Sequence, residues 1–289
     1  MTHRDCGFLR QPLVATTAAA LVIGVTAGLG IAGCSSAASS KTTGKGTVAA
    51  SAQTTAISRA LRLAAAQSRR VNSLTAKLTS RSIGTGAGSL TGTVVIQLKP
   101  RRIIKAAFNV TPAKSAAMQL GEIATNTAVY FSDPAFTKAA GKPWVKANIS
   151  ELPSKVGLSL GSLLQNIESS NPLDQTTLFS TSKNARLVAS AIIHGVPTIE
   201  YAGTYEPRIA LAELTSSLRT LLGPTLHTIG TNPVQFEVWV DAHHIVRQAI
   251  TTDNVHGQIV TTNLEVTSVN RPVHIALPPA HDVAPLPKI

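Results

Sequence analysis

The alternation of apolar and polar positions predicts a protein dominated by β-strands. Segments with a two-residue period are typical of half-buried strands, and Gly, Pro and Asn separate them at short intervals. Short connections of this kind favour antiparallel neighbours, and His194-Gly195 lies at the turn of one predicted hairpin. The predicted strands cover residues 74–83, 90–98, 103–110, 116–123, 129–131, 143–146, 187–193, 198–205, 234–240, 245–252, 259–269 and 273–277.

Helical periodicity is confined to four segments. It predicts helices over residues 57–71, 160–167, 172–179 and 207–222, the last ending at Gly223-Pro224. Helices and strands that occur in blocks, without regular alternation, predict an α+β fold with a single antiparallel sheet. A sheet of about ten strands must curl or split. The tail from Pro278 is Pro-rich, and we expect it to be irregular.

The N-terminus resembles a bacterial lipoprotein signal. Arg4 and Arg10 precede an apolar run that ends in Ile31-Ala32-Gly33-Cys34, which is similar to a lipobox. The resemblance implies acylation of Cys34, removal of residues 1–33 and attachment to the extracytoplasmic face of the cell membrane. A permanent transmembrane helix is the alternative. The Gly and Thr residues of the run, and the lack of a basic cluster directly after it, argue against a permanent span.

The segment after the signal is expected to be a tether. Residues 34–53 are rich in Ser, Ala, Thr and Gly and predict a flexible linker, so residues 54–289 form the expected folded domain. Without the signal the chain keeps one cysteine, Cys34, and no internal disulfide can form. Aromatic residues make up only 4% of the chain against 44% hydrophobic residues, so the interior is aliphatic. Such an interior suits a filled core or the wall of an apolar cavity.

Positive charge gathers next to the predicted anchor. Residues 34–121 contain 13 basic residues and no acidic one. We expect this region, with its basic helix face, to lie on an anionic membrane surface, and a generally basic solvated surface is the alternative. A nucleic-acid partner is disfavoured by the export signal and by the lack of aromatic residues among the basic ones. The basic residues of the first helix are Arg59, Arg62, Arg69 and Arg70.

No group of residues in the sequence supports an enzyme. Ser159 lies in a G-x-S-x-G pattern, but the buried strand that a hydrolase elbow needs is replaced by a segment containing Pro153. A serine hydrolase is therefore a remote alternative. The histidines show no metal-ligand spacing, so we expect no catalytic residue, no metal and no cofactor. The acids in predicted turns or caps are Asp133, Asp174, Asp241 and Asp253.

Several short motifs occur in a recognisable order. They are Val129-Tyr130-Phe131 followed by Gly141–Lys146, Asn171-Pro172, Gly195–Gly203, Glu237–Asp241, and Pro272–Ile275 followed by Pro278-Pro279. In this order they resemble the actinobacterial LppX/LprA/LprF/LprG-type lipoprotein family. The likeness runs over most of residues 55–287.

The resemblance implies a strongly curved antiparallel half-barrel, similar to the LolA/LolB carriers. Helices would pack on its concave side and enclose an apolar cavity that takes acyl chains of envelope lipids or glycolipids. The protein would carry or present these lipids, and an envelope transporter is a candidate partner. The alternative is an interaction or sensor lipoprotein on the same fold, in which bound lipid or a partner protein changes a signal and no lipid is transported. The predicted lining residues are Val94, Ile96, Val129, Phe131, Leu160, Leu164, Leu218, Leu222, Val238 and Val240.

Overall fold

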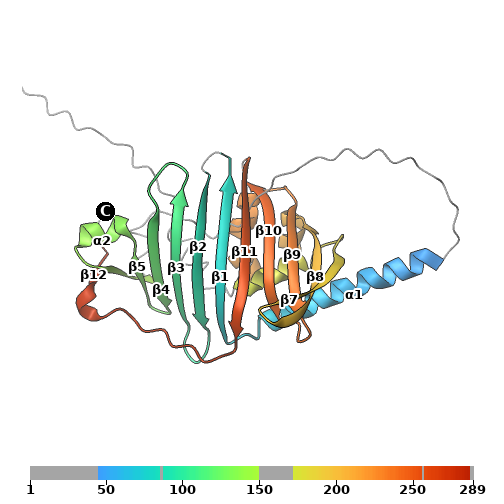
Figure 1. The fold of residues 1–289 in the computed structure, drawn as a ribbon, viewed down its shortest axis with the longest axis horizontal. Helices are drawn as coiled ribbons and strands as arrows, with labels where there is room; N and C mark the ends of the chain where they lie inside the picture. The colour runs from blue at the N-terminus through green and yellow to red at the C-terminus, as the bar shows by residue number, and fades with distance from the viewer. Residues whose placement is uncertain (1–44, 85–86, 150–171, 256, 287–289) are drawn as a thin grey trace, which may run out of the picture.

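The computed structural model describes residues 45–84, 87–149, 172–255 and 257–286. Twelve strands in this part of the chain form one sheet, in the order β12-β6-β5-β4-β3-β2-β1-β11-β10-β9-β8-β7 (Figure 1). Neighbouring strands are antiparallel except β12 and β6, which run parallel. The predicted α+β fold with one sheet is confirmed, and the short parallel pair is an addition to it.

The strands agree with the predicted ones to within a few residues over most of the chain. They are β1 (Ser73–Ile83), β2 (Gly88–Gln97), β3 (Ile103–Pro112), β4 (Met118–Thr125), β5 (Ala128–Ser132), β6 (Trp144–Asn148), β7 (Arg186–Ile193), β8 (Val196–Tyr205), β9 (Val234–Asp241), β10 (Val246–Val255), β11 (Gln258–Val269) and β12 (Val283–Pro285).

The sheet consists of two meanders joined along one pair of strands. Strands β1 to β6 are neighbours in chain order, and so are β7 to β11. Strand β1 joins them by pairing with β11, from Leu74 opposite Val269 to Ile83 opposite Ile259. Residues almost two hundred positions apart in sequence therefore lie side by side at the centre of the sheet (Figure 1).

The described helical segments are α1 (Lys45–Ser68), α2 (Pro134–Ala140), η2 (Pro172–Gln175), α5 (Thr176–Phe179), α6 (Pro207–Glu213), α7 (Ser216–Ile229) and η3 (Ala280–Asp282). Leu61 of α1, Phe179 of α5 and Leu222 of α7 belong to the same buried cluster as Ile96 and Val238 of the sheet. Helices therefore cover one face of the sheet, and the main core lies between the two layers.

The turn between β7 and β8 agrees with its prediction. His194 has a φ of 48° and Gly195 a φ of 78°, so both turn residues lie in the left-handed region. Two such residues form the tight turn whose twist matches that of the flanking strands. Glycine adopts this conformation without strain, which accounts for Gly195 at the second position.

The helical part after β8 differs from its prediction. A single helix over residues 207–222 was expected, whereas α6 ends at Glu213 and α7 begins at Ser216. The side chain of Thr215 caps α7 by accepting a hydrogen bond from the Leu218 amide at 3.4 Å. Helix α7 continues through Gly223-Pro224 because Leu222 before them and Leu226 after them are both buried in the core.

Three shorter predictions were also wrong, and the first helix begins earlier than expected. Residues 273–277 form no strand, since prolines flank the segment and remove donors. The tail after Pro278 is not wholly irregular, because β12 pairs with β6. Residues 134–140, for which no helix was predicted between the strands at 129–131 and 143–146, form α2 with Pro134 in its first turn. Helix α1 begins at Lys45, within the segment expected as a tether.

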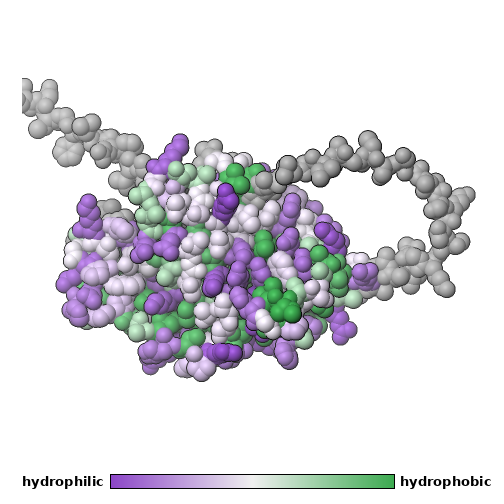
Figure 2. All heavy atoms as spheres, in the orientation of Figure 1, coloured by the Kyte–Doolittle hydropathy of each residue, from purple (hydrophilic) through white to green (hydrophobic). Residues whose placement is uncertain are grey.

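Strand β7 is an edge strand with apolar side chains exposed to solvent. Leu187 and Val188 are almost half exposed, and Ile192 is 72% exposed. Ile199 of β8 adds to this surface, and Figure 2 shows apolar residues gathered at the hairpin. The sheet therefore ends in an uncovered apolar edge on this side.

The centre of the sheet holds a glycine that leaves no room for a side chain. Gly92 of β2 lies opposite Phe108 of β3, and an added Cβ would collide with the Phe108 ring and the Ala107 carbonyl. We expect Gly92→Ala to lower the free energy of unfolding by about 1–3 kcal/mol. The exposed neighbour Thr91→Ala should change it by less than about 0.5 kcal/mol. Urea unfolding measures both, and equal stabilities would contradict the close packing.

Candidate functional site

The interface between the helical layer and the sheet brings most of the predicted lining residues together. Ile96, Val129, Phe131, Leu218, Leu222, Val238 and Val240 are all buried in the main cluster, and Val94 packs against it half-buried. They come from β2, β5, α7 and β9, so the buried cluster extends from β5 to β9 of the sheet. Leu160 and Leu164 lie outside the described residues.

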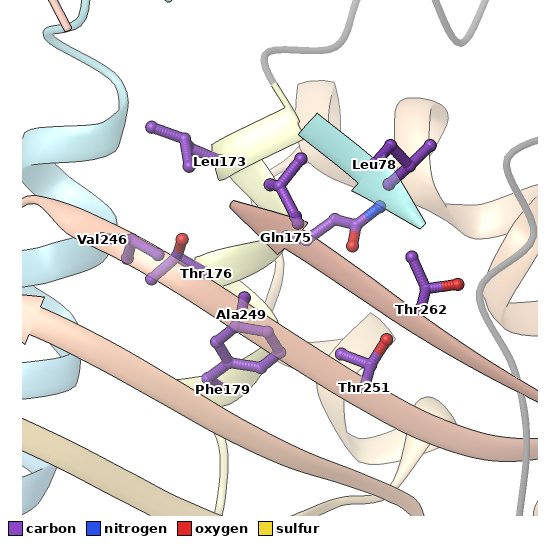
Figure 3. A pocket seen from close by; sticks show the side chains of 10 residues that line it. Leu78, Leu173, Gln175, Thr176, Phe179, Val246, Ala249, Thr251 and Thr262 are labelled. Atoms are coloured by element: carbon purple, nitrogen blue, oxygen red, sulfur yellow. The ribbon is translucent and has the colours of Figure 1, made fainter. Parts of the chain in front are cut away.

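The described residues leave a small cavity in this interface. Its volume is about 20 Å³, and it lies between β1, β10 and β11 on one side and η2–α5 on the other (Figure 3). Such a volume holds about one water molecule. The cavity is lined by Leu78, Leu173, Gln175, Thr176, Phe179, Val246, Ala249, Thr251, Thr262 and Leu264.

Aromatic side chains fill the interface beside this cavity. The rings of Phe179 and Phe236 stack with centroids 4.7 Å apart, and Tyr205 lies 6.3 Å from Phe179. Stacked aromatic pairs add about 0.5–1.5 kcal/mol to the free energy of burial. These rings tie α5 to β8 and β9. The sequence-based prediction of lining residues missed all three, although they occupy the inward positions of two predicted strands and one predicted helix.

Two acidic side chains point into the same interface. Asp253 on β10 is fully buried, and neither of its carboxylate oxygens has a hydrogen-bond partner in the described part of the chain. Glu122 on β4 lies opposite Phe131 and Ala106, and its Oε1 is likewise buried without a described partner. Burial raises the pKa of Glu122 to about 8 and that of Asp253 to about 7.

The sequence placed Asp253 in a turn, and this was wrong. Strand β10 continues to Val255, so Asp253 lies inside the strand and faces the helices. The alternation of a strand could have predicted this, because Ala249, Thr251 and Asp253 are alternate residues and therefore share one face. Asp241 does lie at a turn, where its Oδ1 accepts hydrogen bonds from the amides of His243 and Ile245.

Helix α1 has the amphipathic character that the sequence predicts. Ile57, Leu61 and Ala64 are buried against the domain. The four arginines Arg59, Arg62, Arg69 and Arg70 are exposed. Of these, Arg69 donates a 3.4 Å hydrogen bond to Thr177 Oγ1 on α5. A basic surface therefore lies on the helix nearest to Cys34 in sequence.

Other predicted sites lie beyond the residues that the structure describes. Cys34 and Ser159 both fall in segments outside them. Within the described ranges, no three His, Cys, Asp or Glu side chains gather closely enough to hold a metal ion. Among the helices described, none is both long enough and apolar enough to span a bilayer.

The fold is similar to that of LprF, a member of the family that the sequence motifs resemble. The crystal structure of LprF from Mycobacterium bovis aligns with a TM-score of 0.50 at 13% identity, over 78% of this chain and 97% of that chain. Lipoprotein LppX from Mycobacterium tuberculosis aligns with a TM-score of 0.43 at 16% identity, over 77% and 99% of the two chains. No protein-family model and no curated protein matches the sequence. The likeness defines the fold, and the recognised resemblance is thereby confirmed at that level.

The buried acids predict a stability that falls as pH rises. Both carboxyls keep their protons in the folded chain up to about pH 7–8 but release them near pH 4 once unfolded. Folding therefore takes up protons in this range, so the stability is complete below about pH 4 and is lost towards pH 8. Urea unfolding at pH 5, 6, 7 and 8 should show a falling free energy. Glu122→Gln and Asp253→Asn together should flatten the curve, and an unchanged slope would contradict the assignment.

Proposed function

We propose that this protein is a membrane-anchored envelope lipoprotein that binds acyl chains of lipids or glycolipids and carries or presents them. The observation that carries the proposal is the interface between sheet and helices, where the described predicted lining residues meet in one apolar cluster. The likeness of the fold to LprF supports it. In this proposal the sheet is a curved half-barrel, and the helices on its concave side cover the bound chains.

Binding would require the two layers to separate, because the described cavity holds about 20 Å³. An acyl chain that enters exchanges contacts between Phe179, Ala249 and their neighbours for contacts with methylene groups. Each methylene group that leaves water contributes about 0.8 kcal/mol. Release to a membrane reverses the exchange without covalent chemistry, which agrees with a function as a carrier and not as an enzyme.

The proposed anchor keeps the binding domain close to its lipids. Acylation of Cys34 would hold the chain on the extracytoplasmic face of the membrane, and the exposed arginines of α1 would add attraction to anionic head groups. A single acyl chain binds a membrane only marginally, so a basic surface contributes measurably to attachment.

Native mass spectrometry of the purified protein, incubated with an envelope lipid extract, tests the binding. We expect bound acyl lipid on the native protein and much less on Ala249→Phe, whose larger side chain enters the cavity under Phe179. Gln248→Phe is the matched control, since this residue precedes Ala249 and points to the other face of β10. Circular dichroism shows whether both variants fold. A native protein that takes up no lipid would refute the proposal.

The basic face of α1 generates a second prediction. Arg59→Gln with Arg62→Gln should weaken binding to vesicles of anionic lipid by roughly 30-fold, at about 1 kcal/mol for each arginine. The pair Lys138→Gln and Arg208→Gln, exposed on α2 and α6, is the control with the same change in charge. Vesicle sedimentation at low and high salt measures both pairs. Equal losses of vesicle binding by the two double variants would show that attachment depends on net charge alone and not on the face of α1.

A second candidate function is an interaction lipoprotein on the same fold. The observation that favours it is the uncovered apolar edge at β7, with Leu187, Val188 and Ile192 exposed. An extended segment of a partner protein could pair with this edge. Cross-linking from β7 in intact cells, with no lipid found on the purified protein, would favour this candidate over the carrier.

A further inference from the structure

A row of polar side chains interrupts the apolar face of the sheet that the helices cover. Thr251 lies opposite Thr262, and Thr262 lies opposite Ser80, so three hydroxyl groups align across β10, β11 and β1. Asp253 follows Thr251 by two positions and points to the same face. We call these four residues the polar row. Gln175 reaches towards it from η2 on the other side of the cavity (Figure 3).

The polar row is only partly satisfied by the protein. Thr262 Oγ1 donates a 3.0 Å hydrogen bond to Ser80 Oγ. Thr251 Oγ1 and both carboxylate oxygens of Asp253 are buried, and within the described ranges none of the three atoms has a partner. A buried polar atom without a partner destabilises a protein by about 1–3 kcal/mol. Three such atoms on alternate residues of one strand therefore mark a place for a group from outside the described chain.

The chemistry of the polar row fits a neutral ligand group. No basic residue lines the cavity, so an anionic head group would find no counter-charge there, and Asp253 adjoins the cavity through Thr251 without lining it. Burial raises the pKa of Asp253 to about 7, so much of this carboxyl is protonated near neutral pH and can both donate and accept. A ligand hydroxyl group also donates and accepts, and the Thr251 hydroxyl, which has no partner in the described ranges, can serve as its second partner.

The size of the cavity agrees with a hydroxyl group. About 20 Å³ is room for one water-sized group and not for an acyl chain. The surrounding wall is apolar apart from the threonines and Gln175, and it includes Leu78, Phe179 and Leu264. A chain that lies between the layers would thus meet hydrogen-bonding groups at this single place.

We propose that the polar row at Thr251 and Asp253 is a subsite that binds a hydroxyl group of an acyl lipid. The inference rests on the proposed lipid binding and adds the ligand's chemical class. The hydroxyl can belong to the head group or to the acyl chain, because either presents the same donor and acceptor. Thr251 and Asp253 then select among lipids, while the apolar interface supplies the affinity.

Two matched pairs of neutral ligands test the subsite. In the first pair, the affinities of octadecanol and octadecyl methyl ether are compared to test a terminal hydroxyl. In the second pair, the affinities of methyl 12-hydroxyoctadecanoate and methyl octadecanoate are compared to test a hydroxyl within the chain. Displacement of a pyrene-labelled hydrocarbon from the purified protein gives the dissociation constants. We expect the hydroxyl-bearing member of at least one pair to bind roughly fivefold more tightly, which corresponds to one net hydrogen bond of about 1 kcal/mol. The pair that shows the preference identifies the source of the hydroxyl.

Thr251→Val and Asp253→Leu should each abolish the preference and leave the affinity for the ether or the plain ester unchanged. Thr261→Val is the matched control, because Thr261 is exposed on the other face of β11. Thr251→Val changes the shape of the side chain very little, so the test stands even if Asp253→Leu fails to fold.

The outcomes separate the subsite from the proposed function. Equal affinities within both pairs would overturn the subsite and leave lipid binding intact. A preference that survives in Thr251→Val and Asp253→Leu would overturn it as well, and so would tighter binding of octadecylamine than of octadecanol. A crystal structure with octadecanol in which an ordered water still occupies the polar row would show a structural water only. Absence of binding by every ligand would overturn both proposals.

Discussion

The pairing of β1 with β11 is the constraint on which the rest of the structure depends. It joins the β1–β6 meander to the β7–β11 meander along ten pairs of residues. Without it each meander would expose a long edge in the middle of the domain. Helix α5 and the cavity lie near this seam, because β1, β10 and β11 supply one wall of the cavity and α5 contributes to the other. A contact between segments so distant in sequence forms only after a large loop closes, which requires the rest of the sheet to stabilise it.

The interface between the layers combines two opposing requirements. Its aliphatic and aromatic side chains stabilise the fold by leaving water, whereas Glu122 and Asp253 destabilise it, since a buried charge has few compensating partners there. A protein selected only for stability would carry apolar residues at these two positions. Their presence on the covered face is easier to understand if that face also has to recognise something, and it makes the same surface sensitive to pH.

The sequence predicted the parts of the fold that depend on local pattern. Strand alternation defined β1 to β3 and β7 to β11, and the His194-Gly195 turn followed from residue type. The continuation of helix α7 past Gly223-Pro224 could not be predicted from local pattern, because burial of Leu222 and Leu226 outweighed that stop signal. Asp253 was assigned to a turn because it opens the segment Asp253–Gly257, which was expected to connect two strands. Two further features depend on contacts between distant segments and cannot be predicted from local pattern. They are the pairing of β1 with β11 and the alignment of Thr251, Thr262 and Ser80.

The two edges of the sheet are unlike. At one end β12 is three residues long and includes Pro285, which has no amide hydrogen to offer to another strand. At the other end β7 presents a full strand with Leu187 and Ile192 uncovered. Growth of an extended β-assembly needs two competent edges on every copy, and in the described part of the chain only β7 is a long exposed edge. Association through β7 therefore favours a pair of copies over a fibre.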